Sequence, residues 1–196
     1  MIETATAACS VALIERGQVI AEQHDLVGRG HAERLVPMIA ELPDGGRAAH
    51  ILVDVGPGSF TGIRVGIAAA RGLGLGWGAT VAGMSSLALV AAAAGAGPLA
   101  VVLEGGHGEL FMQVFNTSPL APAGPLLSLP PAAVWERATG LRLVGDGVRW
   151  LESDDPRAAP RGPLPSAADA VLLPPALTGL PACPIYGRAP DAKLPA

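Results

Sequence analysis

The stretch GPGSFTGIRVG, residues 56–66, has the composition of a loop that holds a phosphate group. It contains four glycines in eleven residues and follows an apolar run, 50–55, that predicts a strand. A glycine-rich turn between a strand and a helix can bind an anion through backbone N–H groups and the helix dipole. However, the G-K-[ST] ending of a Walker A loop is missing, and Thr61 replaces the third glycine of the dinucleotide fingerprint. We therefore favour a structural turn in which Ser59 caps the following helix.

A stripe of small residues runs along the helix predicted over 59–76. Its members recur every four residues, with an isoleucine beside each of the first two: Gly62, Gly66, Ala70 and Gly74, flanked by Ile63 and Ile67. This spacing places them on one helix face. A glycine inside a helix costs roughly 1 kcal/mol relative to alanine, and close approach of another backbone is the usual compensation. The stripe packs either on the protein's own sheet or on a helix of another protein, and the sequence favours neither.

Other residues with catalytic chemistry are scattered along the chain. Glu3, Glu104 and Glu109 are the carboxylates nearest predicted strand ends, whereas Asp54 sits within a strand run. A nuclease needs several carboxylates that converge on a divalent metal ion. The four histidines show no paired ligand spacing, and neither a G-x-S-x-G motif nor a C-x-x-C pair occurs. The sequence therefore indicates no catalytic centre and no metal site.

The composition narrows the class of protein. The chain has 196 residues, 15% of them charged, and a net charge of −4. The low fraction of charged residues favours packed globular lobes. A protein that binds nucleic acid by itself needs a basic surface, and the negative net charge argues against that class of protein. The uncharged stretch 72–103 contains seven glycines and a proline, which favours buried elements over a membrane span. Because no signal-peptide core opens the sequence, we expect a cytoplasmic protein without membrane contact.

Hydrophobic periodicity predicts a mixed α/β order of elements. We expect hairpins at 9–24 and 99–115, strands at 50–55, 79–83 and 141–145, and helices at 31–42, 59–76, from Ser85 or Ser86 onward, and near 166–173. The order fits one RNase H-like lobe followed by the first hairpin of another. We place the first lobe at 1–100 and a smaller, proline-rich lobe at 101–196.

Four segments resemble the TsaB family, also called YeaZ. They are IETATAACSVAL (2–13), HAERLVPMI (31–39), GPGSFTGIRVG (56–66) and PIYGRAPDAKLP (184–195). The resemblance runs almost from end to end. It implies an α/β, actin/Hsp70-like (ASKHA) fold of two RNase H-like lobes with mixed sheets, the second lobe being reduced.

The resemblance also implies a non-catalytic partner subunit, and so not an enzyme, in the synthesis of tRNA threonylcarbamoyladenosine. Members of the family bind the catalytic paralogue TsaD, which transfers the threonylcarbamoyl group to the adenosine beside the anticodon in tRNAs that read A-starting codons. They work with the ATPase TsaE, form homodimers when the partner is absent, and meet tRNA only through the complex. We assign no cofactor, and ATP or ADP at the partner interface is left open.

The family builds its partner interface from two helices, which correspond here to 31–42 and 59–76. The predicted interface residues are therefore Leu35, Met38, Ile39, Leu42, Gly62, Ile63, Gly66, Ile67, Ala70 and Gly74. A vestigial site for a nucleotide or phosphate is implied near the first strand, at Glu3, Thr4, Thr6 and Ser10.

The sequence departs from the family in three ways, one of which is a second lobe that is short for the family. The family has a longer first strand ending in Asp-Thr-Ala-Thr, where this chain has Glu3 shortly after Met1, so we expect a weakened sheet there. The second-lobe turn, usually Asp-Ala-Arg-x-Gly-Glu, reads EGGHGE at 104–109, which weakens the case for nucleotide or tRNA contact at this turn.

Two other functions compete with this one. An ATP-dependent ASKHA-class enzyme, a small kinase or ATPase, is the alternative, although residues 3–6 lack the glycine of its phosphate loop. A glycopeptidase activity rests only on the historical naming of the paralogue.

Overall fold

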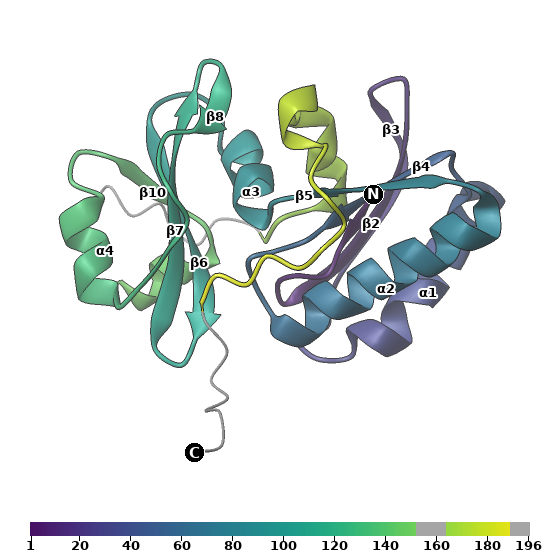
Figure 1. The fold of residues 1–196 in the computed structure, drawn as a ribbon, viewed down its shortest axis with the longest axis horizontal. Helices are drawn as coiled ribbons and strands as arrows, with labels where there is room; N and C mark the ends of the chain where they lie inside the picture. Colours follow the sequence, from purple (N-terminus) through teal and green to yellow (C-terminus); the bar gives the residue numbers. More distant parts are fainter. Residues whose placement is uncertain (152–163, 189–196) are drawn as a thin grey trace.

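The computed structural model describes residues 1–151 and 164–188, which form two lobes, each built on a five-stranded mixed sheet (Figure 1). The strands are β1 (Ile2–Glu3), β2 (Ala8–Glu15), β3 (Gln18–Leu26), β4 (His50–Asp54), β5 (Thr80–Met84), β6 (Leu99–Gly106), β7 (Glu109–Thr117), β8 (Leu120–Pro122), β9 (Leu127–Leu129) and β10 (Arg142–Val144). The α-helices are α1 (His31–Ala40), α2 (Phe60–Trp77), α3 (Ser86–Ala94) and α4 (Pro131–Arg137). Short 3-10 helices are η1 (Pro43–Gly46), η2 (Asp146–Trp150), η3 (Ala167–Leu172) and η4 (Pro175–Leu177).

The first sheet has the strand order β3-β2-β1-β4-β5. Its first three strands are antiparallel, and β1, β4 and β5 run parallel to one another. The second sheet has the order β10-β6-β7-β8, with β9 also paired to β7 and β10 parallel to β6. Parallel neighbours need a crossover connection, which helices supply here. The predicted α/β class and the two mixed sheets are confirmed.

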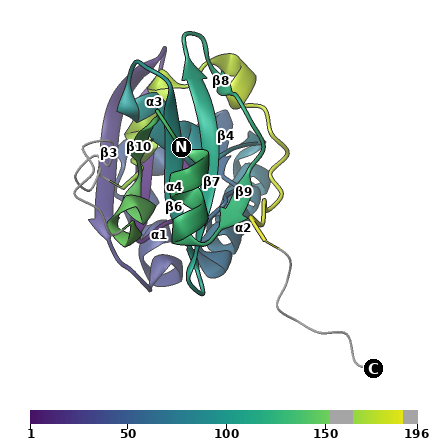
Figure 2. The same ribbon diagram turned by 90° about the vertical axis from the view of Figure 1, so that its left-hand side faces the viewer.

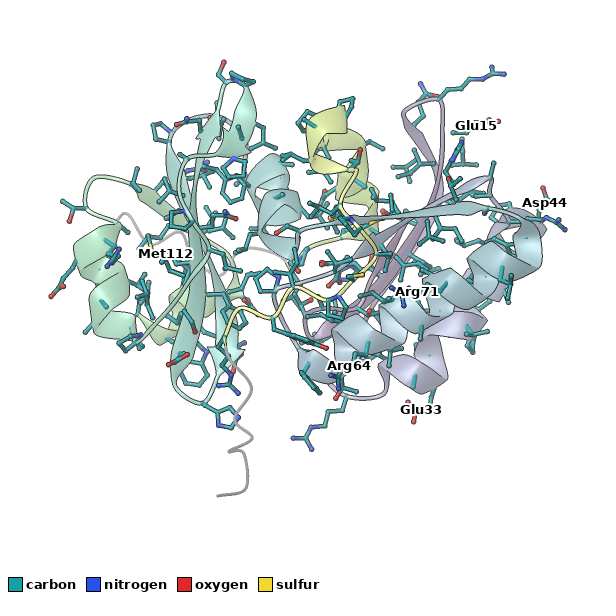
Figure 3. The ribbon with its side chains drawn as sticks, in the orientation of Figure 1. Glu15, Glu33, Asp44, Arg64, Arg71 and Met112 are labelled. Atoms are coloured by element: carbon teal, nitrogen blue, oxygen red, sulfur yellow. The ribbon has the colours of Figure 1, made fainter. Side chains whose placement is uncertain are left out.

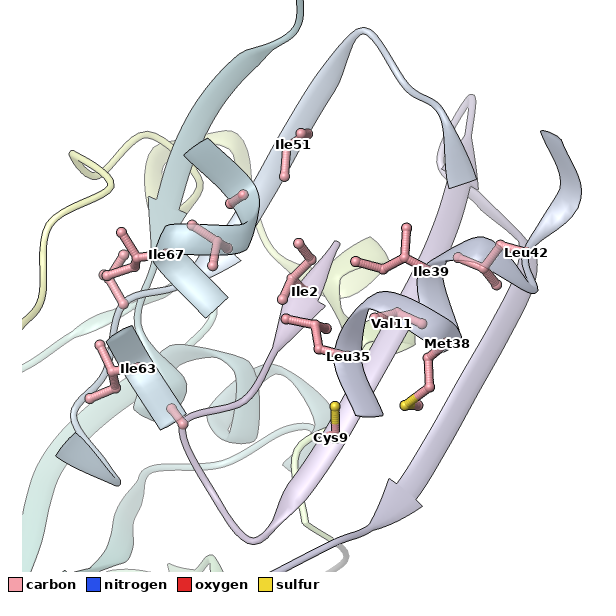
Figure 4. Close-up of a cluster of buried hydrophobic side chains, with 14 residues drawn as sticks. Ile2, Cys9, Val11, Leu35, Met38, Ile39, Leu42, Ile51, Ile63 and Ile67 are labelled. Atoms are coloured by element: carbon pink, nitrogen blue, oxygen red, sulfur yellow. The ribbon is translucent and has the colours of Figure 1, made fainter. Parts of the chain in front are cut away.

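The elements form layers (Figures 1 and 2). Helices α1 and α2 cover the outer face of the first sheet over the apolar cluster shown in Figure 4. Helix α3 lies between the sheets and shares a second cluster with the second sheet, which joins Leu87 and Leu89 to Leu99 and Phe115. Helix α4 covers the far side of the second sheet. The division of the chain at residue 100 stays a prediction.

Local differences from the expected elements have local causes. Helix α1 ends at Ala40 with Pro37 inside it, two residues earlier than predicted. The segment predicted as a helix near 166–173 is a 3-10 helix opened by a capping box at Ser166. Strands β8 and β9 and helix α4 were not predicted, because each is short and lies in the proline-rich half. Residues 189–195 of the family-like tail lie outside the described residues.

Both predicted helix caps are confirmed. The Ser59 hydroxyl accepts the N–H of Gly62 at the start of α2, and the Ser85 hydroxyl accepts the N–H of Leu87 at the start of α3, each at 3.2 Å. Helix α2 ends at Trp77 and is capped by Gly78, whose φ of 68° lies in the left-handed region. Within the described residues, no helix is long and apolar enough to cross a membrane.

The stripe of small residues on α2 faces the first sheet. A Cβ atom added at Gly62 would overlap the carbonyl oxygen of Thr4, and one added at Gly66 would overlap the Thr4 hydroxyl. At Gly74 it would lie 2.6 Å from a methyl group of Val81 on β5. The Thr4 hydroxyl also donates a hydrogen bond to the Gly62 carbonyl at 2.8 Å. The glycines therefore let the α2 backbone approach the end of β1.

The C-terminal segment crosses from the first lobe to the second. Leu180 exchanges two backbone hydrogen bonds with Gly83, of 2.6 and 3.0 Å. The Ile185 N–H donates to the Val55 carbonyl at 2.7 Å. Gly187 then packs on the ring of Phe111 in the second sheet. The segment is seen crossing in front of both lobes in Figure 1, and it therefore fastens one lobe to the other.

Two glycine substitutions in α2 test this packing. We expect Gly62→Ala to lower the free energy of unfolding by about 2 kcal/mol, because the added methyl group meets the fixed backbone of Thr4. Gly72→Ala is the matched control: an added Cβ there meets nothing within 4 Å, so it should raise stability by about 0.5–1 kcal/mol. Urea unfolding measures both. Equal stability of the two variants would contradict the packing described.

Candidate functional site

The ten residues predicted at the partner interface are buried inside the first lobe. Three of them lie on α1 and one lies just after it, and all four are in the core between the helices and the sheet (Figure 4): Leu35, Met38, Ile39 and Leu42. Those of α2 face the sheet: Gly62, Ile63, Gly66, Ile67, Ala70 and Gly74. We therefore correct the predicted interface, because these side chains are not accessible to a partner. The physical reason is that an amphipathic helix in a globular lobe turns its apolar face to its own sheet.

The outer faces of α1 and α2 carry a second set of small and apolar residues. On α1, Ala32, Val36 and Ala40 recur every four residues and are exposed. On α2, the exposed residues Ala68, Gly72 and Gly76 have the same spacing, and Leu75 beside them is 89% exposed. We call these seven residues the outer face. Helices α1 and α2 contact each other (Figure 1), so we treat the seven residues as one surface.

Charged side chains border the outer face. Glu33 projects from the outer side of α1 (Figure 3). On the other side of α1, toward β3, Arg34 pairs with Asp25 at 2.5 Å and with Glu41 at 3.4 Å. Arg71 of α2 donates to the Ala182 carbonyl at 2.7 Å. An apolar, small-residue centre with a charged border is the usual anatomy of a protein interface.

An aromatic cluster stands at the start of α2. The rings of Phe60 and Tyr186 stack with centroids 5.2 Å apart. The Arg64 guanidinium lies 3.5 Å from the centroid of Phe60, and its Nε donates to the Tyr186 hydroxyl at 2.8 Å. Phe60 is 54% and Tyr186 41% exposed. The cluster holds the C-terminal segment against α2 and extends the exposed apolar surface of this helix.

The four residues of the implied phosphate site are buried and serve the fold. The Thr4 hydroxyl donates to Gly62 beneath α2, as described above. The Thr6 hydroxyl donates to Glu3 Oε1 at 3.3 Å. The Ser10 hydroxyl accepts the N–H of Ala167 at 2.9 Å, beneath η3. Thr6 also borders the cleft between the lobes. The structure therefore gives Glu3, Thr4 and Ser10 internal partners and brings no phosphate-binding group together from the set.

A cleft of about 910 Å³ separates the lobes. Arg29 and Arg64 line it from the first lobe, and Glu104 and Asp146 from the second. Glu104 pairs with Arg149, and its N–H donates to the Asp146 carboxylate at 3.2 Å. Burial raises the pKa of Asp146. The cleft therefore mixes both signs of charge, and its acidic groups already have partners.

The three carboxylates considered for metal chemistry do not converge. Glu3 is in the core of the first lobe. Glu104 lines the cleft, and Glu109 accepts a hydrogen bond from the Ser128 hydroxyl at the edge of the second sheet. Across residues 1–151 and 164–188, no group of three or more His, Cys, Asp or Glu side chains could hold a metal ion.

Sequence reasoning missed the outer face, the aromatic cluster and the position of Asp54. The outer face had a visible signal, since Ala68, Gly72 and Gly76 repeat every four residues as the inner stripe does. The aromatic cluster joins residues 122 positions apart, so no local pattern reveals it. Asp54 is the last residue of β4, and the parallel register places it beside Glu3.

Known proteins resemble this chain in sequence. The family model "TsaD: tRNA N6-adenosine threonylcarbamoyltransferase" matches residues 17–118. The tRNA threonylcarbamoyladenosine biosynthesis protein TsaB of Escherichia coli is 37% identical over 121 residues, which cover 56% of this chain and 51% of that protein. The protein of the same name from Haemophilus influenzae is 41% identical over 98 residues, 47% of this chain and 41% of that protein. An uncharacterized protein of Mycobacterium tuberculosis is 30% identical over 199 residues, 98% of this chain and 92% of that protein.

A solved structure resembles the whole fold. YeaZ from Pseudomonas aeruginosa superposes with a TM-score of 0.77 and 29% identity, over 94% of this chain and 97% of that one. The match to the two TsaB sequences, in contrast, spans about half the length of those proteins or less. The two mixed sheets and this superposition establish the actin/Hsp70-like fold of two lobes. The chain belongs to the TsaB/YeaZ family, within the wider group that the TsaD family model describes.

Proposed function

We propose that this chain is a non-catalytic subunit required for threonylcarbamoylation of the adenosine next to the anticodon in tRNAs that read A-starting codons. It acts by binding a catalytic TsaD-like paralogue. A TsaE-like ATPase joins the same complex, and the chain contacts tRNA only as part of this complex. When the paralogue is absent, the chain forms a homodimer. The names of the two TsaB relatives support the pathway.

The outer face of α1 and α2 is the observation that carries this proposal. It replaces the buried residues first predicted and keeps the same two helices. Exposed Val36 and Leu75 would be left in water without a partner, since a contiguous apolar patch on a helix pair marks an interaction site. Gly72 and Gly76 leave the α2 backbone open, and an added Cβ meets nothing there within 4 Å. A partner helix can therefore approach α2 from outside as closely as β1 does from inside.

A scaffold role is also supported by how the polar groups are used. The residues of the implied phosphate site hold the β1–β2 loop, α2 and η3 in place. Glu104 and Asp146 of the cleft are engaged with Arg149 and a backbone N–H. Each of these contacts is structural and none needs a substrate.

The alternative is an ATP-dependent enzyme of the ASKHA class, and the cleft between the lobes is the feature that favours it. ATP hydrolysis by the purified chain that is lost in Asp146→Asn would support the enzyme. This substitution keeps an oxygen that accepts the Glu104 N–H, so the loss would report chemistry and not unfolding.

Substitutions on the outer face should weaken partner binding without unfolding the lobe. We expect Ala68→Glu and Leu75→Glu to weaken binding of the TsaD-like paralogue by roughly tenfold or more, because each buries a charge at the interface. Leu172→Glu is the control: Leu172 is 53% exposed on η3, across the sheet from α2. Calorimetric titration with the purified paralogue measures affinity, and circular dichroism checks folding. Unchanged affinity of folded Ala68→Glu and Leu75→Glu would refute the outer face as the interface.

Depletion of the protein in its own cell tests the pathway. Threonylcarbamoyladenosine in bulk tRNA should fall and should be restored by the wild-type gene. A gene carrying both Ala68→Glu and Leu75→Glu should not restore it, whereas Leu172→Glu should. Nucleoside analysis by mass spectrometry measures the modification. A level that does not change on depletion would overturn the assignment.

A further inference from the structure

Two carboxyl groups lie side by side in the core of the first lobe. Strand β1 runs parallel to β4 with Ile2 opposite Val53, so the next residues, Glu3 and Asp54, are neighbours on the same face of the sheet. Both are fully buried, at 0% exposure. Buried carboxyl groups normally pair with a cation or a full set of hydrogen-bond donors.

Each carboxyl group uses one of its oxygens to hold a loop. Glu3 Oε1 accepts the N–H groups of Ala5 and Thr6 at 2.8 and 3.1 Å, in the turn that follows β1. Asp54 Oδ1 accepts the N–H of Gly56 and the hydroxyl of Ser86, both at 2.7 Å, at the turn that leads into α2. The second oxygens, Glu3 Oε2 and Asp54 Oδ2, have no hydrogen-bond partner among the described residues.

The surroundings disfavour two negative charges. Burial, and then the charge of Asp54, raises the pKa of Glu3 well above its usual value. Burial raises the pKa of Asp54 to about 7. In the described part of the chain, no Arg or Lys forms an ion pair with either group.

The other titratable groups around the pair are few. Cys9 precedes Ser10, the residue of β2 that pairs with Glu3, and burial, followed by the charge of Glu3, raises the pKa of the Cys9 thiol. His31 of α1 bonds the Thr6 and Ala8 carbonyls with its Nε2. From η3, the Asp169 carboxylate accepts the N–H of Ser166. The facing residue of α3 is Ser86, which is uncharged. Within the described residues, none of these groups forms an ion pair with Glu3 or Asp54.

We propose that Glu3 and Asp54 share one proton, so that a carboxylic acid O–H of one donates to the free oxygen of the other and ties the turn after β1 to the turn before α2. The proton satisfies both oxygens that lack a partner and halves the buried charge. Because both groups bind protons more tightly in the folded than in the unfolded chain, they stabilise the fold fully at acidic pH. This contribution begins to be lost as the pH rises through about 7, where the first proton of the pair leaves, and it is lost completely when the shared proton leaves at higher pH.

Carbon-13 NMR of the wild-type protein, labelled in its Glu and Asp carboxyl carbons, tests the shared proton directly. We expect the pair to titrate in two steps, the lower near pH 7, and between the steps one carboxyl should show the chemical shift of a protonated acid and the other that of a carboxylate. Two carboxylates that are both ionised at pH 6 would overturn the proposal. So would a metal ion retained in equimolar amount on dialysis, because a cation would then replace the proton.

Isosteric variants provide the second measurement. The thermal unfolding midpoint of the wild type should fall by about 5 °C or more between pH 6 and pH 9. In Glu3→Gln and Asp54→Asn the amide N–H replaces the acidic O–H, so this fall should shrink to less than half. Glu15→Gln, at the exposed end of β2, should keep the wild-type fall. Variants with the wild-type pH dependence would contradict the shared proton, and the NMR titration decides the matter if neither variant folds.

Discussion

The close approach of α2 to the end of β1 is the constraint on which the first lobe depends. Gly62 and Gly66 pass over the backbone and hydroxyl of Thr4 with no room for a methyl group. This contact sets the distance between the α2 axis and the first sheet. Because α1 packs beside α2, the same distance determines where α1 lies on the sheet. The apolar cluster between the helices and the sheet then follows from the inward faces of both helices.

Because the inner glycines pack inside the lobe, the partner surface that we propose lies on the other side of the same helix. Helix α2 carries small residues on both faces, the inner ones under steric necessity and the outer ones in open space. Each exposed glycine lowers helix stability by roughly 1 kcal/mol relative to alanine. The fold gives no reason for Gly72 and Gly76, which is why we connect them with a partner. The aromatic cluster of Phe60, Arg64 and Tyr186 adjoins this surface and links it to the segment that joins the lobes.

Much of the fold could be predicted from the sequence, because periodicity and caps are local. Ser59 was correctly expected to open α2, and Ser85 is one of the two serines expected to open α3. The strands of the first sheet lie close to their predicted positions. The site was predicted less well. Periodicity showed that Gly62, Gly66 and Gly74 share a face, but not whether this face meets the sheet or the solvent. That choice depends on Thr4, which is 58 residues away from Gly62.

Long-range register accounts for the other omissions. Asp54 and Glu3 are unremarkable in separate segments, and their pairing exists only once β1 and β4 are aligned in parallel. The short 3-10 helices and strands of the second lobe carry too few residues for a periodic pattern, so tertiary packing decides them.

Side-chain footprinting of this chain, alone and with the TsaD-like paralogue that we propose as its partner, tests the central claim most directly. Hydroxyl-radical oxidation reports the exposure of individual side chains, and Val36, Phe60 and Leu75 are all more than half exposed in the free protein. The account predicts that the paralogue protects these three residues and leaves Trp150 and Leu172 as reactive as before. Protection of Trp150 or Leu172, with no change at Val36 and Leu75, would contradict it.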